Sequence, residues 1–156
     1  MSRLSTVFLV VEDEPSDAEF LQRAFDAAGG KDRVHVVTNG EEAVAYLEGA
    51  GERADRSRFP VPDVIITDLK MPHMNGLELL QWLHASDTWR NTPKVVLTSS
   101  TAQSDVTTAY TLGAAAYLVK PVSIHELRAI AKAMSDFWKH AVKPPSLMTG
   151  DAIKAP

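Results

Sequence analysis

The chain has 156 residues, no cysteine and a formal net charge of −4 at pH 7, a length that fits one domain with tails. The lack of cysteine excludes disulfides, thiolate nucleophiles and thiolate zinc sites, and it fits a cytoplasmic protein. The sequence has no long run of lysine or arginine, which disfavours nucleic acid and membrane surfaces as partners. It also has no apolar run long enough to span a bilayer.

Short apolar runs alternate with stretches of helical spacing. The run 7–11 predicts a strand, and the next segment predicts a helix over about 16–28, with Gly29-Gly30 as its stop signal. A second strand is expected over 34–38, and Asn39-Gly40 then opens a second helix. The chain therefore begins with two strand–helix units.

The middle of the chain starts with a segment rich in Gly, Arg, Asp and Pro, Gly49 to Pro62. We expect a solvated loop there, longer than most connections in a compact domain. The run 63–67 is almost entirely apolar, as expected of a central parallel strand that is covered on both faces. Helical spacing resumes at Leu77, which predicts a third strand–helix unit.

Two further units complete the pattern. A strand is expected over 94–98, a helix over about 104–112, a strand over 116–119 and a last helix from a capping box at Ser123. Residues 141–156 are expected to form a flexible tail after a domain that covers 1–140. Five strand–helix units with short loops predict an α/β domain with a five-stranded, doubly wound parallel sheet and helices on both faces.

Polar residues stand where four of these strands stop. Glu12-Asp13, Asp68, Thr98-Ser99 and Lys120 each follow an apolar run directly. Because the carboxyl ends of parallel strands share one edge, these side chains should converge there, and a hard cation would offset the repulsion between the carboxylates. Taken singly, the acids could serve a helix N-terminus or cap a loop, and Lys120 could be an ordinary strand-end lysine.

The combination resembles two-component response-regulator receiver domains over residues 6–138. Asp68 and Thr98 are 98 − 68 = 30 positions apart, Thr98 and Lys120 are 120 − 98 = 22 apart, and Met71-Pro72 with Asn75-Gly76 matches the loop that follows the phosphoacceptor of that family. The resemblance implies the flavodoxin-like fold with strand order 2-1-3-4-5.

The resemblance also implies a role for each residue. Asp68 would accept the phosphoryl group, Lys120 would pair with a phosphoryl oxygen, and the Thr98 hydroxyl and Ser99 N–H would bind the other oxygens. The ligands of Mg²⁺ would be Glu12, Asp13, Asp68 and the backbone carbonyl of Lys70. The Lys120–Pro121 peptide bond is expected to be cis.

Signal transmission is expected to involve Thr98 and Tyr117, with the aromatic ring moving inward as phosphate draws the hydroxyl. The alternative is a strand tyrosine whose hydroxyl lies in solvent. Phe137 and Trp138 could form a dimer patch or anchor the last helix in the core. Lys70 could ion-pair with Glu12 or screen the phosphoryl group from water, which would slow its loss.

The expected partners are a sensor histidine kinase, a downstream protein and a second copy bound through the fourth helix, fifth strand and fifth helix. The chain resembles stand-alone receivers that serve phytochrome-type kinases. Only self-catalysed phosphoryl transfer and slow dephosphorylation are expected, without enzymatic turnover. The alternatives are a receiver-like module that takes no phosphate, an aspartyl-nucleophile phosphatase, disfavoured by Lys70, and a flavin carrier, disfavoured by the acids after the first strand.

Overall fold

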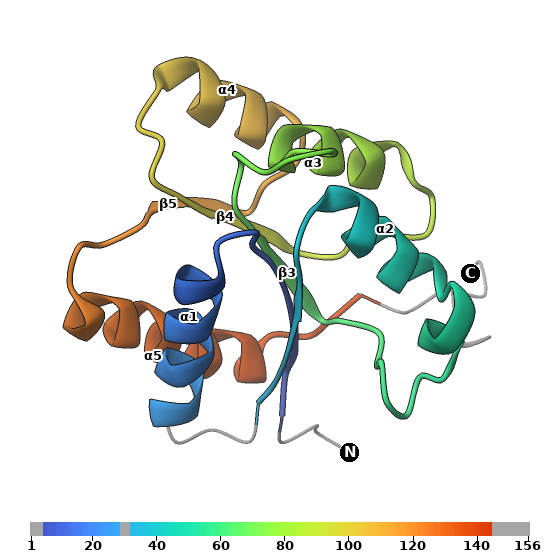
Figure 1. Cartoon of the computed structure of the whole chain (residues 1–156), viewed down its shortest axis with the longest axis horizontal. Helices are drawn as coiled ribbons and strands as arrows, with labels where there is room; N and C mark the ends of the chain where they lie inside the picture. The colour runs from blue at the N-terminus through green and yellow to red at the C-terminus, as the bar shows by residue number, and fades with distance from the viewer. Residues whose placement is uncertain (1–4, 29–31, 145–156) are drawn as a thin grey trace.

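The computed structural model describes residues 5–28 and 32–144, and they form a parallel sheet covered by helices on both sides (Figure 1). The sheet order is β2-β1-β3-β4-β5 with all neighbours parallel, which confirms the predicted fold. The strands are β1 (Val7–Val11), β2 (Arg33–Val37), β3 (Val64–Thr67), β4 (Lys94–Thr98) and β5 (Ala116–Val119). The helices are α1 (Pro15–Ala27), α2 (Gly40–Glu48), the 3₁₀ helix η1 (Gly51–Ala54), α3 (Gly76–Ala85), α4 (Gln103–Thr111) and α5 (Ile124–His140).

The two faces of the sheet have separate cores. Phe8 and Val10 of β1 face α1 and α5, where they lie in one cluster with Phe25. Leu9 and Val11 point the other way and pack with residues of α2 and α3. Figure 1 shows the same layering, with α1 and α5 on one side and α2, α3 and α4 on the other. Because both faces are covered, β1 is apolar throughout and β3 is apolar up to its last residue, Thr67.

The N-terminus of α3 fixes the chain that leaves β3. Asn75 and Glu78 form a reciprocal capping box, and the Gly76 N–H donates to the Leu69 carbonyl at 2.9 Å. A Cβ atom at Gly76 would lie 2.0 Å from the Asp68 carbonyl oxygen. The close approach requires glycine, and it holds the strand end that carries Asp68 against the helix.

The segment Gly49 to Pro62 is more ordered than the sequence indicates. It contains η1, and Arg56 donates from Nη1 to the Tyr46 carbonyl at 2.9 Å and from Nη2 to the Leu47 carbonyl at 2.7 Å. These carbonyls belong to the last turn of α2, where few helical N–H donors remain, and the Tyr46 carbonyl also accepts the Gly49 N–H at 3.1 Å. The segment is solvated as predicted, since most of residues 50–58 are exposed, but the Arg56 side chain binds it to the end of α2.

The edge strand β5 carries exposed apolar groups. Val119 is 47% exposed and Phe137 of α5 is 64% exposed. The backbone N–H of Tyr117 donates to the Tyr110 hydroxyl of α4 at 3.1 Å.

A groove of about 430 Å³ lies between β4, β5 and α5, with Phe137 and Trp138 among its lining. Trp138 also packs against the core, so only one of the two aromatic residues is an anchor.

The described part of the predicted tail contacts the residues just before β1 and β3. Lys143 Nζ lies 3.4 Å from the Thr6 hydroxyl and 3.9 Å from an Asp63 carboxylate oxygen. The rest of the tail, from residue 145, and the predicted helix stop at Gly29-Gly30 lie outside the described residues. Within the described ranges, no helix has both the length and the apolar composition that crossing a membrane requires.

Candidate functional site

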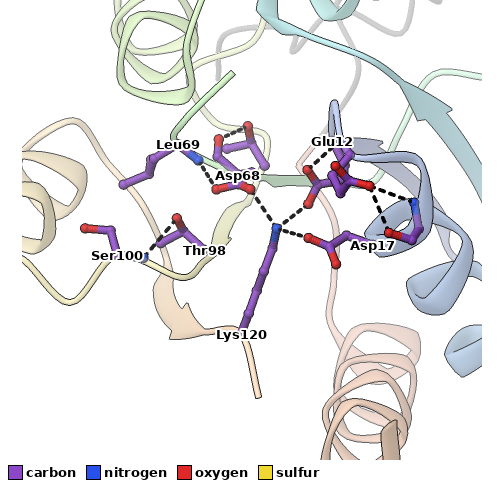
Figure 2. Close-up of polar contacts among 10 residues, drawn as sticks. Glu12, Asp17, Asp68, Leu69, Thr98, Ser100 and Lys120 are labelled. Carbon is purple, nitrogen blue, oxygen red and sulfur yellow. Dashed lines mark hydrogen bonds and ion pairs between the residues drawn. The ribbon is translucent and has the colours of Figure 1, made fainter. Parts of the chain in front are cut away.

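Lys120 is the centre of a charged cluster at the carboxyl edge of the sheet. Its ammonium lies 2.5 Å from Glu12 Oε1, 2.8 Å from Asp17 Oδ2 and 2.7 Å from Asp68 Oδ2. Figure 2 shows the lysine reaching three carboxylates that come from the end of β1, from α1 and from the end of β3. The side chains of Glu12 and Asp68 are 6% and 9% exposed, so these contacts are sheltered from water.

Carboxylates from two strand ends form a possible cation site. One oxygen each of Glu12, Asp13 and Asp68 lies within 4.8 Å of the others. Oxygen ligands from a few carboxylates, with room left for water and phosphate, are the set that Mg²⁺ prefers. The donor set therefore fits a divalent hard cation, in agreement with the convergence predicted from the strand ends.

Burial and ion pairing set the protonation of the cluster. Burial raises the pKa of Glu12 to about 7, against the lowering effect of the hydrogen bond from Lys120. Burial also raises the pKa of Asp68, but hydrogen bonds from Lys120 and Thr98 outweigh it, so the net pKa falls below the ordinary value. For Lys120, burial lowers the pKa and the three carboxylates raise it by more. The result is an ionised Asp68 beside a firmly protonated lysine.

A hydroxyl-bearing loop follows β4 next to Asp68. Thr98 is buried, and its hydroxyl oxygen accepts the Ser100 N–H at 3.4 Å. The Ser100 hydroxyl donates to an Asp105 carboxylate oxygen of α4 at 2.5 Å, whereas Ser99 is exposed. The loop thus links the hydroxyl beside Asp68 to the start of α4.

Tyr117 is joined to the same loop. Its hydroxyl donates to the Ser100 carbonyl at 2.9 Å, and its ring packs against the cluster that includes Leu69, Val96 and Ala109. The alternative of a tyrosine hydroxyl in solvent is therefore wrong. The contact runs from β5 to the residue two positions after Thr98.

Two expectations about the neighbourhood of the site are corrected. Within the described ranges every peptide bond is trans, so the expected cis bond between Lys120 and Pro121 is wrong. The backbone of Lys120 is held to the end of β4, since its N–H donates to the Thr98 carbonyl at 2.8 Å. Lys70 is exposed, and Glu12 pairs with Lys120 instead of with Lys70.

Sequence reasoning missed two acidic residues near the site. Asp17 lies in the first turn of α1 and pairs with Lys120, and Asp105 lies in the first turn of α4 and accepts from Ser100. The available signal was an acid in the first helical turn after a strand-end motif. That signal has an ordinary explanation, since acids are favourable at helix N-termini.

Comparison with known proteins points to one family. The sequence model of the response regulator receiver domain matches residues 8–132. Response regulator Rcp1 of Synechocystis sp. is 29% identical over 140 residues, which cover 90% of this chain and 93% of Rcp1. The Mn²⁺-bound form of Rcp1 superposes with a TM-score of 0.78 at 28% identity, covering 90% of this chain and 99% of that chain.

Two further solved structures are similar over the same extent. One is the phosphorylated cyanobacterial phytochrome response regulator RcpA, with 31% identity and a TM-score of 0.82. The other is the response regulator RPA3017, described in red light signalling of R. palustris, with 30% identity and a TM-score of 0.83. Each comparison covers 90% of this chain and 99% of the other.

Proposed function

The chain belongs to the response regulator receiver domain family, and from this premise we propose that it is a single-domain response regulator phosphorylated on Asp68. The observation that carries the proposal is the sheltered contact of Asp68 with Lys120, 2.7 Å apart, beside a group of three carboxylates. An ionised carboxylate next to a fixed cation is a suitable acceptor for phosphorus.

The transfer step follows from this arrangement. A carboxylate oxygen of Asp68 forms a bond to the phosphorus of a phosphohistidine in the kinase, and the P–N bond breaks. The electron pair of that bond stays on the imidazole nitrogen, and water later hydrolyses the acyl phosphate to inorganic phosphate and free Asp68. Lys120 offsets the charge that gathers on the phosphoryl oxygens, and positioning with charge neutralisation accounts for most of the catalysis.

Glu12, Asp13, Asp68 and the Lys70 carbonyl would hold Mg²⁺. When bound, the ion would neutralise charge between the acidic cluster and the phosphoryl oxygens. The fit of the three carboxylates supports this assignment, and the relative Rcp1 has a Mn²⁺-bound form. The Thr98 hydroxyl and the Ser99 N–H would bind the remaining phosphoryl oxygens.

Lys70 would slow the loss of phosphate by standing in the path of water. Its exposed position two residues after Asp68 supports this role. An aspartyl phosphatase has a second acid at that position, so turnover as a phosphatase is disfavoured. Lys70→Ala is expected to shorten the half-life of the phosphorylated protein, measured by intact-protein mass spectrometry; a longer half-life than wild type contradicts the role.

The phosphoryl signal would reach the surface through Thr98 and Tyr117. Pulling Thr98 toward phosphate strains its contact with Ser100, whose carbonyl holds the Tyr117 hydroxyl and whose side chain holds α4. Phosphate thereby favours one of two arrangements of the surface of α4, β5 and α5. A Tyr117→Ala protein that is phosphorylated and self-associates like wild type would refute this switch.

The proposed partners are a sensor histidine kinase, a downstream protein and a second copy of the chain. RcpA is called a phytochrome response regulator and RPA3017 belongs to red light signalling, which supports a phytochrome-type kinase. The exposed Phe137 beside the apolar groove of β5 and α5 supports a homodimer on that face.

One experiment tests the central proposal. The protein is incubated with acetyl phosphate and Mg²⁺, with Asp68→Asn as the matched control. Intact-protein mass spectrometry should show one added phosphoryl group in the wild type only. If the wild type gains no phosphoryl group, the result would favour a binding module that takes no phosphate. If the Asp68→Asn variant still gains a phosphoryl group, Asp68 is excluded as the acceptor.

A further inference from the structure

We infer that Asp17 is a positioning residue for phosphoryl transfer. It holds the Lys120 ammonium beside Asp68 while the other two carboxylate partners of the lysine, Glu12 and Asp68, bind a cation or the phosphoryl group. The inference rests on the proposed function and adds a residue from α1 to it. Asp17 acts through Lys120 and touches no reacting atom.

The argument begins with the hydrogen-bonding capacity of the lysine. An ammonium has three N–H donors, and Lys120 has three carboxylate acceptors, Glu12, Asp17 and Asp68, at 2.5–2.8 Å. Each donor therefore has one acceptor. A phosphoryl oxygen can bind the ammonium only by replacing one of these carboxylates.

The three acceptors are not equivalent. Glu12 and Asp68 belong to the carboxylate group that can bind a cation, and Asp68 is also the proposed acceptor. A bound cation competes for the oxygens of both, and phosphorylation turns the Asp68 carboxylate into an acyl phosphate, whose carboxyl oxygens no longer carry the negative charge that binds Lys120. Asp17 belongs to α1, and Figure 2 shows it reaching Lys120 from the helix side. Its contact is the one that can persist through both events.

An open space beside Lys120 gives Asp17 a second role, which is to keep the lysine side chain from turning away from Asp68. A cavity of about 180 Å³ lies between α1 and the start of α5, and both Lys120 and Asp17 line it together with Phe20 and Ile124. A lysine that had lost its contact with Asp17 would have room to turn toward this cavity, since its stem is flexible. Asp17 stands where it prevents that motion.

The contact matters for placement more than for stability. The Asp17 side chain is 41% exposed, whereas Lys120 is 19% exposed, and half-exposed ion pairs contribute little free energy. A catalytic group that is misplaced by about 1 Å can nevertheless cost orders of magnitude in rate. Asp17→Asn should therefore fold normally and transfer phosphate slowly.

The test compares the initial rate of phosphorylation by acetyl phosphate at saturating Mg²⁺ in wild type, Asp17→Asn, Asp17→Glu and Glu19→Gln. Glu19 forms an exposed pair with Arg23 on the same helix, so it is the matched control. We expect Asp17→Asn to be about tenfold slower, with Mg²⁺ affinity by calorimetry changed by less than about twofold. Asp17→Glu should recover most of the rate, and Glu19→Gln should equal wild type.

Three results overturn the inference: an unchanged rate in Asp17→Asn, a faster rate from removal of a charge that repels the donor, or an Asp17→Glu variant as slow as Asp17→Asn. A second readout needs no phosphoryl donor. The Lys120 ammonium resonance in ¹⁵N-labelled, Mg²⁺-loaded protein should be visible in wild type and lost through fast exchange in Asp17→Asn; an unchanged resonance also overturns it. If wild type takes up no phosphate, the proposed function fails, and this resonance alone decides whether Asp17 holds Lys120.

Discussion

Replacing Glu12 with glutamine removes a charge that is costly to bury, and the structure gives the size of the effect. The Glu12 side chain is 6% exposed, and burial raises its pKa from 4.5 to about 7 even beside Lys120. Each unit of pKa shift corresponds to about 1.4 kcal/mol, so ionised Glu12 costs the folded protein about 3 kcal/mol. Glutamine keeps the shape and the hydrogen-bond acceptor and lacks this cost.

The pH dependence of the effect has a definite sign. The folded-state pKa lies above the unfolded value, so the stability that protonated Glu12 contributes is complete below pH 4.5 and is lost as the pH rises through about 7. The Glu12→Gln variant keeps this stability at every pH, because glutamine does not ionise. In the absence of metal, the variant should exceed wild type by less than about 1 kcal/mol at pH 5 and by about 3 kcal/mol at pH 8.

Urea unfolding in EDTA, followed by tryptophan fluorescence at both pH values, measures this difference. The exposed Glu19→Gln variant should differ from wild type equally at the two pH values. Adding Mg²⁺ should stabilise wild type more than Glu12→Gln, since a ligand stabilises the state that binds it. A stability gain that does not change with pH, or a variant less stable than wild type at pH 8 without metal, refutes the reasoning.

Three further substitutions test other parts of the structure. Gly76→Ala places a methyl group 2.0 Å from the Asp68 carbonyl oxygen, and urea unfolding should show a loss of at least about 2 kcal/mol. Arg56→Ala removes the donors of two α2 carbonyls and should cost about 1–3 kcal/mol in the same assay; an unchanged midpoint would show that water replaces the guanidinium. Phe137→Ala should weaken self-association in analytical ultracentrifugation at an unchanged melting temperature, whereas Trp138→Ala should lower the melting temperature because Trp138 packs against the core.

The strands and the acidic edge were predictable from the sequence because they depend on local order along the chain. A fully buried strand needs a continuous apolar run, as in β1 and β3, and parallel strands bring their carboxyl ends together whatever their loops. Glu12, Asp68 and Lys120 therefore meet as expected.

The contacts that the sequence did not indicate join distant or ambiguous positions. Asp17 and Lys120 are 103 positions apart, so their contact depends on how α1 packs against α5, the helix that follows Lys120. Arg56 lies in a segment whose composition is equally typical of a solvated loop. The isomer of Lys120–Pro121 was predicted wrongly, because trans and cis forms before proline differ by only about 1 kcal/mol and tertiary contacts choose between them.

The Tyr110 hydroxyl that accepts the Tyr117 N–H has a consequence for unwanted assembly. A strand at the border of a sheet offers unused main-chain groups on which a foreign chain can align, and this is a route to aggregation. In β5 one of the outward donors is already satisfied by a side chain of the neighbouring helix. An incoming strand would have to displace a phenol to gain that bond, so the Tyr110 hydroxyl disfavours extension of the sheet at Tyr117.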